Sequence, residues 1–208
     1  NNASFKSDLT VLELDELQGR HHLRQVVLLQ LISQIQREIF LGDRGRKRIV
    51  VIDEAWDLLK EGEVARFMEH AYRKFRKYGG SAIIATQSIQ DLYSNEAGVA
   101  IANNSANMFL LAQKATTIEQ VKKDSKLVLD EWGYQTLKSV HTEPGIFSEV
   151  FMLVGPSQAV GRLVVSDFQK LLYSTTPKDV ADIQKYQDQG CSITDAINAV
   201  LRDRGISR

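Results

Sequence analysis

Short apolar runs alternate along the chain with longer segments in which apolar residues recur every three or four positions. The longer segments, at about 22–40 and 64–78, have helical spacing, and Gly79-Gly80 stops the second of them. The short runs have the length of buried strands, and they cover residues 9–14, 49–52, 81–86 and 107–111. Strands that alternate with helices predict an α/β fold with a mainly parallel sheet and helices on both of its faces.

The same pattern predicts which of these elements are buried. The helix from about His22 to Phe40 is apolar nearly all round, so we expect it to be buried. The run 49–52 is continuous and mostly β-branched, which is typical of a parallel strand covered on both faces.

From about Thr116 the pattern changes to short helices and one hairpin. Turn residues 155–158 separate two predicted strands, which cover 147–154 and 160–165. Helices are expected at 117–126 and 130–140, and two more begin near Thr176 and Ser192. Thr176-Pro177 with Asp179 close behind has the cap, proline and early acid of a helix start.

Composition and charge narrow the class of protein. With 208 residues, 43% hydrophobic and 25% charged, the chain suits one soluble globular domain, with or without an appendage. The 26 basic and 26 acidic residues give no net charge, which argues against a polyanion as the main partner. Cys191, the single cysteine, excludes an intramolecular disulfide and fits a reducing cytoplasm, although a disulfide-free extracellular domain would look the same. No run reaches the roughly 18 apolar residues that a membrane span needs.

Two consecutive carboxylates, Asp53 and Glu54, end the apolar strand 49–52. Ligands of parallel sheets bind at the carboxyl ends of the strands, so acids at this point can act on a ligand. Asp53 can hold Mg²⁺, usually through water, and Glu54 can orient or deprotonate the water that attacks a γ-phosphate. The pair therefore has the pattern of a Walker B motif. The alternative is that both acids only cap the helix that follows, because acids at a helix N-terminus stabilise it by about 0.3–1 kcal/mol.

The next predicted strand also ends in polar residues, Thr86, Gln87 and Ser88. If the two strands are neighbours, the Gln87 amide faces the same crevice as Asp53 and can hydrogen-bond a γ-phosphate or the attacking water. The alternative is that Thr86 and Gln87 only satisfy the backbone of a loop.

Basic residues form two further candidates. Arg73, Lys74, Arg76 and Lys77 crowd the last turn of the second helix, where they could meet phosphate, DNA or a neighbouring subunit. A solvated face that favours the helix dipole is the competing explanation. Arg162 follows Gly161 in the predicted hairpin, and an arginine in that place could reach the nucleotide of another subunit. His21-His22 is interpreted as surface, and Trp56 and Trp132 as packing residues.

One motif is missing. A phosphate-binding loop has the form Gly-x-x-x-x-Gly-Lys-Ser/Thr, and this sequence contains no Gly-Lys pair. The phosphate-binding part of a nucleotide site is therefore not in these residues. The sequence also begins without methionine, and we expect it to be part of a longer chain.

The order and spacing of four motifs resemble the TraC-type ATPases of conjugative pilus assembly and type IV secretion. These motifs are Ile49–Trp56, Arg76–Gly80, Ala85–Ser88 and Leu172–Pro177. The resemblance extends from near Asp8 to at least Pro177. It implies a RecA-like motor fold of the HerA/FtsK type, with the Walker A strand and loop upstream of this segment.

The resemblance also implies roles for individual residues. Asp53 matches the Walker B aspartate, Glu54 the catalytic glutamate and Gln87 the phosphate-sensing glutamine. Arg76-Lys77 matches the basic pair before the sensor strand. Arg162 is our candidate for the arginine that acts on a neighbouring subunit.

The expected division follows from this family. Residues 1–115 would be a partial RecA-like core, 116–176 would complete the motor domain with helices and a hairpin, and 177–208 would be a helical appendage. The family implies ATP with Mg²⁺, a hexamer, contacts with other secretion components, and work at the cytoplasmic face of the inner membrane, reached through partners. The alternatives are a DNA-translocating coupling-type ATPase and a non-catalytic docking module.

Overall fold

The computed structural model describes residues 7–17, 19–43, 45–54 and 62–206. By their internal contacts the residues form two compact units. The first comprises Asn1–Asn107 with Glu119–Val128, and the second comprises Met108–Ile118 with Leu129–Arg208. The division into 1–115, 116–176 and 177–208 stays a prediction.

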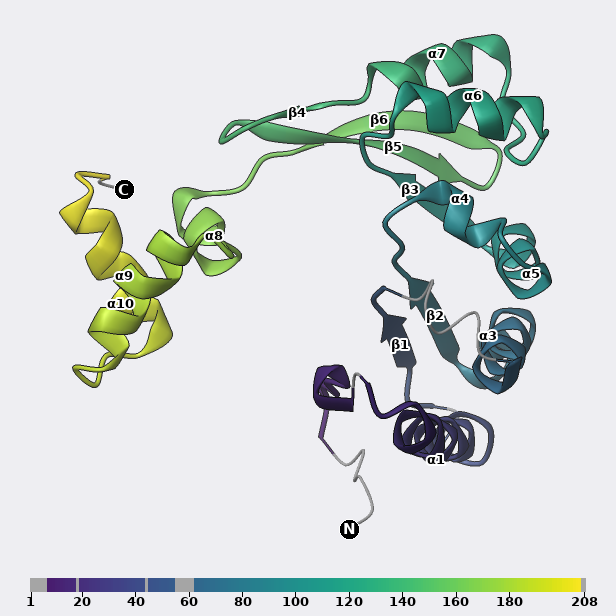
Figure 1. Ribbon diagram of the computed structural model, residues 1–208, viewed down its shortest axis with the longest axis horizontal. Helices are drawn as coiled ribbons and strands as arrows, with labels where there is room; N and C mark the ends of the chain where they lie inside the picture. The colour runs from purple at the N-terminus through teal and green to yellow at the C-terminus, as the bar shows by residue number, and fades with distance from the viewer. Residues whose placement is uncertain (1–6, 18, 44, 55–61, 207–208) are drawn as a thin grey trace. The chain divides into compact units, whose positions relative to one another are not determined.

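The first unit contains two parallel strands and the helices that connect them (Figure 1). Its elements in chain order are η1 (Asp15–Leu17), α1 (His21–Phe40), β1 (Arg48–Ile52), α3 (Gly62–Lys74), η2 (Phe75–Tyr78), β2 (Gly80–Ile84), α4 (Ile89–Leu92) and α5 (Glu96–Asn104). The predicted strands and helices at these positions are confirmed to within a few residues. Gly79 ends η2 in the left-handed conformation, with φ of 71°, which is the helix stop that the Gly79-Gly80 pair predicted.

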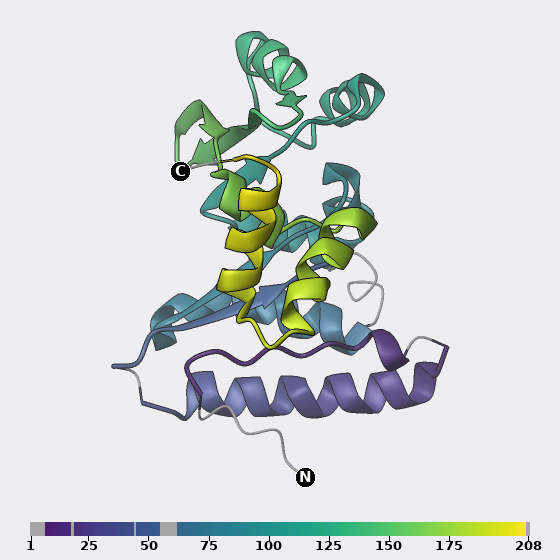
Figure 2. The ribbon, with the colours of Figure 1, turned by 90° about the vertical axis from the view of Figure 1, so that its left-hand side faces the viewer.

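One face of β1 and β2 carries the core of this unit. Buried residues from four elements form it with the inward side chains of the strands: Leu28, Ile39, Phe67, Met68, Ala71, Phe75 and Ile101. On the strands, Val50, Ile52, Ala82 and Ile84 pack against this cluster. The 20-residue helix α1, seen along its full length in Figure 2, contributes only part of its surface to the core.

Exposure contradicts three expectations about burial. Residues 9–14 lie outside any strand, and Leu9 is 78% exposed. Helix α1 is only partly covered, since Val26 is 61% exposed. β1 alternates between covered and open positions, and Ile49 on its open face is 66% exposed. An apolar pattern predicts that a surface prefers burial, but among the described residues helices cover only one face of these strands.

The second unit is built on a four-stranded sheet in which β5 pairs with each of the other strands. Its strands are β3 (Asn107–Leu110), β4 (Thr142–Glu143), β5 (Phe147–Val154) and β6 (Ser157–Leu163). The predicted hairpin is confirmed, because β5 and β6 are antiparallel and pair Val154 with Ser157. The run 107–111 was expected in the same parallel sheet as 49–52; instead it pairs with β5.

Short helices precede and follow the hairpin along the chain, and the first of them, α6 (Ala115–Lys123), is divided between the two units. Helices α6 and α7 (Glu131–Ser139) precede β4, and Asp130 caps α7 by accepting a 2.7 Å bond from the Gly133 N–H. Three more helices, α8 (Asp167–Leu172), α9 (Pro177–Gln187) and α10 (Ile193–Asp203), share a core of their own around Ile197. Arg204 holds two of them together through ion pairs of 2.8 Å to Asp179 and 2.7 Å to Asp182. No helix in the described part of the chain has the length and apolar character to cross a membrane.

Candidate functional site

The two parallel strands of the first unit end at a common edge (Figure 1). Ile52 pairs with Ile84 at the last step of the ladder, and the Ala85 N–H donates a further bond of 3.0 Å to the Ile52 carbonyl. Asp53 and Glu54 directly follow one strand, and Thr86-Gln87 directly follows the other. The expectation that these polar residues share one carboxyl edge therefore agrees with the geometry.

A hydrogen bond joins the two strand ends. The Gln87 Nε2 donates to the Glu54 Oε1 at 3.2 Å, and all three side chains of Asp53, Glu54 and Gln87 are exposed. Glu54 has φ of 48°, a left-handed backbone that is uncommon for a residue with a side chain. Its N–H donates to the Asp53 Oδ1 at 2.9 Å. Strain of this kind concentrates at functional sites, where the surrounding structure holds it in place.

The residue after Gln87 is fixed by a helix cap. Ser88 accepts a bond of 3.2 Å from the Gln90 N–H through its hydroxyl, and its own N–H donates to the Asp91 Oδ2 at 3.0 Å. These bonds complete a capping box at the start of α4. Ser88 was noticed in the sequence only as part of a polar strand end; the Ser-x-x-Asp spacing was the signal for the cap.

Arg76 and Lys77 do not join this cluster within the chain. Both lie in η2, before β2 begins, and the Arg48 N–H bonds the Gly79 carbonyl at the same end of the sheet. Five residues of strand separate this amino edge from the carboxyl edge, a span of about 16 Å at ~3.3 Å per residue. A helix that leads into a parallel strand has to end at the strand's amino end, so the basic pair and the carboxylates belong to opposite edges. Both basic side chains are exposed.

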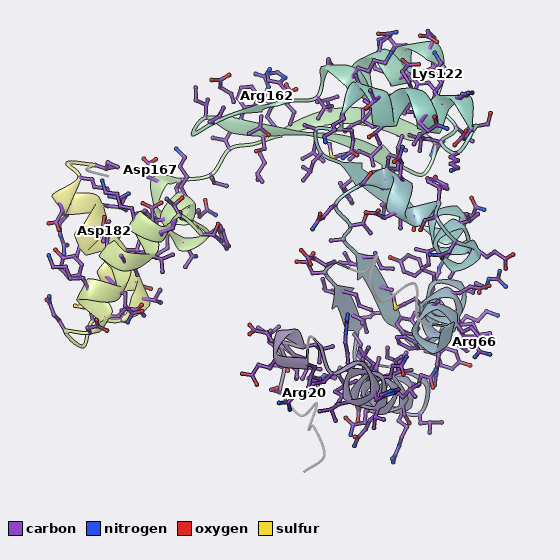
Figure 3. All side chains as sticks on the ribbon, viewed as in Figure 1. Arg20, Arg66, Lys122, Arg162, Asp167 and Asp182 are labelled. Carbon is purple, nitrogen blue, oxygen red and sulfur yellow. The ribbon has the colours of Figure 1, made fainter. Side chains whose placement is uncertain are left out.

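Arg162 lies in the second unit, on β6 (Figure 3). Its Nε donates to the Glu149 Oε1 at 3.0 Å, and its guanidinium carbon lies 4.2 Å from the centre of the Phe147 ring. Glu149 is the one charged residue buried among those described, with 8% of its surface exposed. The hairpin register, which pairs Glu149 with Arg162, was the signal that the sequence analysis missed.

The Glu149 carboxylate stays ionised despite its burial. Burial raises its pKa, but hydrogen bonds from Arg162 and from the His141 backbone N–H, together with the charges of both residues, hold the pKa below its usual range. The His141 Nδ1 also lies 3.0 Å from the Glu149 Oε2.

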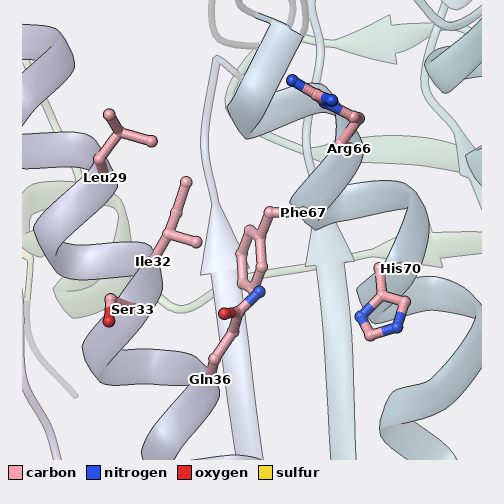
Figure 4. Close-up of a pocket in the computed structure, with 7 residues that line it drawn as sticks. All are labelled: Leu29, Ile32, Ser33, Gln36, Arg66, Phe67 and His70. Atoms are coloured by element: carbon pink, nitrogen blue, oxygen red, sulfur yellow. The ribbon is translucent and has the colours of Figure 1, made fainter.

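Two tryptophans were expected to pack. Trp56 lies outside the described residues. Trp132 is 64% exposed, so the prediction for it is wrong. A separate groove between α1 and α3, lined by Leu29, Ile32, Phe67 and four polar residues, contains none of the carboxyl-edge residues (Figure 4).

The donor set at the carboxyl edge fits a nucleotide-bound Mg²⁺ ion. Among the described residues, no three acidic, histidine or cysteine side chains gather closely enough to hold a metal by themselves. Mg²⁺ is usually bound by one or two carboxylates together with water and substrate phosphates, and a single exposed aspartate at a strand end suits that mode.

The TraG P-loop domain family model matches residues 3–204, nearly the whole length of the chain. The chain belongs to the TraG P-loop domain family. Protein TraC of Escherichia coli (strain K12) is 30% identical to this TraG P-loop domain over 197 residues, which are 91% of the chain and 22% of TraC. The resemblance to TraC-type ATPases is thereby confirmed.

A solved structure supports the fold of this TraG P-loop domain. VirB4 of Thermoanaerobacter pseudethanolicus superposes with a TM-score of 0.58 at 24% identity, over 80% of this chain and 44% of that one. The α/β fold with a parallel sheet is thus shared with VirB4. The chain spans about a fifth of TraC and less than half of the VirB4 chain.

Proposed function

We propose that this chain supplies the Walker B and sensor part of an ATPase that powers type IV secretion, and in particular conjugative pilus assembly. One observation carries the proposal: the Gln87 amide and the Glu54 carboxylate are hydrogen-bonded at the carboxyl edge of two parallel strands, beside Asp53. Membership in a P-loop family fits this edge as the nucleotide side of the sheet.

Each residue has a role that suits its chemistry. Asp53 helps to hold Mg²⁺ with ATP, and Glu54 orients or deprotonates the attacking water. General-base catalysis of this kind contributes about 10²–10⁴ in rate. Gln87, whose amide already reaches Glu54, hydrogen-bonds either the γ-phosphate or the water, and so distinguishes ATP from ADP.

The phosphate-gripping loop has to come from another part of the protein. The sequence has no Gly-Lys pair, and the relatives are longer than this chain. We therefore expect the 208-residue chain by itself to hydrolyse no ATP, and appreciable turnover by the purified chain would contradict this assignment.

The test uses the complete protein that contains this chain. Glu54→Gln keeps the size of the side chain and removes the base, so we expect kcat to fall by about 10² or more while ATP still binds. Glu16→Gln, at an exposed position outside the carboxyl edge, is the matched control and should leave kcat unchanged. Equal turnover in Glu54→Gln and the control would refute the proposal.

The basic residues would act between copies of the protein. Because Arg76 and Lys77 lie at the amino edge, they reach a nucleotide at a carboxyl edge only if a second copy is placed head to tail with the first. Repetition of a head-to-tail contact closes a ring where its rotation allows, and we propose the hexamer that the resemblance implies. Arg76 and Arg162 are the two candidates for the arginine that stabilises the charge of the transition state.

A mixing experiment separates these candidates. An inactive Glu54→Gln protein and an inactive Arg76→Ala protein should restore part of the activity when mixed. Some interfaces then combine the intact Glu54 of one copy with the intact Arg76 of its neighbour. A mixture of the Glu54→Gln protein with an Arg162→Ala protein tests the other arginine in the same way. We place the assembly at the cytoplasmic face of the inner membrane, in contact with other secretion components.

A DNA translocase of the same superfamily is the second candidate. The exposed basic residues Lys47, Lys74, Arg76 and Lys77 at the amino edge favour it, whereas the neutral chain does not. DNA binding whose affinity falls steeply with salt would support the translocase. A docking module would instead keep its partner binding in the Glu54→Gln protein.

A further inference from the structure

The contacts of Arg162 indicate that neighbouring residues fix the orientation of its guanidinium group. Two hydrogen bonds converge on the buried Glu149 carboxylate, from the Arg162 Nε at 3.0 Å and from the His141 N–H at 3.3 Å. The His141 Nδ1 lies 3.0 Å from the same carboxylate and also 3.0 Å from the Ser139 carbonyl oxygen. The Phe147 ring lies against the guanidinium, and the His141 ring meets Phe147 edge-on at 5.5 Å. Phe147 and Glu149 lie on the central strand β5, Arg162 lies on its neighbour β6, and His141 directly precedes β4.

The contacts restrict Arg162 in two ways. The bond to Glu149 fixes the Nε side of the guanidinium, and the Phe147 ring fixes its plane. The side chain is still 60% exposed, so its Nη end remains accessible. A long arginine normally loses much rotamer freedom when it binds a ligand, and this arginine has lost part of that freedom in advance.

We propose that Glu149 is a positioning residue, which with Phe147 and His141 holds Arg162 so that its two Nη groups form an oxyanion-binding fork. The ligand is a phosphate group of a nucleotide held by a second copy of the protein, so the inference rests on the proposed function. The planar fork matches two oxygens of one phosphate.

The sign of one effect distinguishes positioning from simple charge. The negative charge of Glu149 weakens the attraction of Arg162 for any anion. If the charge of Arg162 alone mattered, Glu149→Gln would therefore raise turnover. If the orientation of the Arg162 guanidinium matters, Glu149→Gln lowers turnover, because a neutral acceptor forms a weaker hydrogen bond with the Nε.

The main experiment is a double-mutant cycle in the complete protein. Arg162→Lys removes the fork and should lower kcat by about 10² or more. Glu149→Gln should lower kcat by about tenfold, as is usual for residues that orient a functional group, with KM within about twofold. The double variant should be no slower than Arg162→Lys alone, since a lysine has no guanidinium fork for the carboxylate to orient.

A control accounts for loss of stability. Val150→Ala, next to Glu149 on β5, weakens the same sheet without touching Arg162, and it should leave kcat unchanged. Unchanged or increased kcat in Glu149→Gln overturns the proposal. So does a loss that adds fully to that of Arg162→Lys, or a loss that Val150→Ala reproduces.

A separate measurement distinguishes failure of this inference from failure of the proposed function. In the 208-residue chain, the NMR signal of the Arg162 Nε–H should be sharp and slow to exchange, and Glu149→Gln should broaden it. A signal broad in both proteins overturns the positioning role. A sharp signal together with full turnover in Glu54→Gln would refute the ATPase assignment instead.

Discussion

Gly80, the first residue of β2, provides the sharpest test of how the strands pack on their helices. A methyl group at this position would lie 3.2 Å from the Phe75 Cβ and 3.3 Å from the Ile39 Cγ2. The Phe75 Cβ is attached directly to the backbone, so it cannot move aside by a change of rotamer. Gly80→Ala therefore pushes β2 away from the buried layer.

Two effects of opposite sign determine the result. Alanine reduces the freedom of the unfolded chain, which stabilises by about 0.4–1 kcal/mol where the backbone permits it. Gly80 does have a backbone that alanine can adopt, because its φ is not positive. Overpacking of a tight site costs about 1–3 kcal/mol. We expect a net loss of about 0.5–2 kcal/mol in the free energy of unfolding.

Gly62 is the matched control. It is the first residue of α3, and no described residue lies within 4 Å of an added methyl group. Gly62→Ala should stabilise by about 0.4–1 kcal/mol, because only the effect on the unfolded chain remains.

Amide hydrogen exchange is the suitable assay, because it reports on the strand pair separately from the second unit. The N–H groups of Arg48 and Ala85 close the ladder at its two ends, with bonds of 3.1 Å and 3.0 Å. When exchange follows equilibrium opening, each loss of about 1.4 kcal/mol in the free energy of opening increases the exchange rate of these N–H groups tenfold. If Gly80→Ala slowed exchange as much as Gly62→Ala, the packing of β2 on Phe75 and Ile39 would be wrong.

Two further predictions concern other parts of the fold. Ser88→Ala removes the capping box of α4 and should destabilise the first unit by about 1 kcal/mol, measured by urea unfolding, whereas Ser88→Asp should retain most of the stability. The Ser174 hydroxyl and then Arg204 lower the pKa of Asp179, so its contribution is complete above the unfolded pKa of about 3.9 and is lost as the pH falls through the lower folded value. Thermal unfolding of the chain between pH 6 and 2.5 should show this loss, and Asp179→Asn should flatten the curve; an unchanged curve would contradict the role of the carboxylate.

The elements of the fold were predictable because local chemistry determines them. Gly79 ends a helix since it alone adopts the left-handed backbone without strain, and Pro177 begins one because its missing N–H costs nothing there. The carboxyl edge was predictable too, once the two strands were taken as neighbours, because adjacent parallel strands in register bring Glu54 and Gln87 together.

Burial and the environment of Arg162 were harder to predict. Apolar residues such as Ile49 favour burial. Whether a second layer of helices covers them depends on residues far away in sequence or in other chains. The contact between Arg162 and Glu149 depended on the hairpin register, and a shift of one residue would have placed the two side chains on opposite faces.

The left-handed backbone of Glu54 has a consequence for how sequences of this family tolerate change. Glycine adopts φ near 48° without strain, and a side chain in a sparsely populated conformation costs about 1–3 kcal/mol. A library of variants selected for folding alone would therefore enrich glycine at position 54, whereas a library selected for the proposed ATPase activity of the complete protein would lose it. Selection for stability would favour Glu54→Gly and selection for activity would remove it. The difference between the two enrichments would measure how much the glutamate contributes to activity.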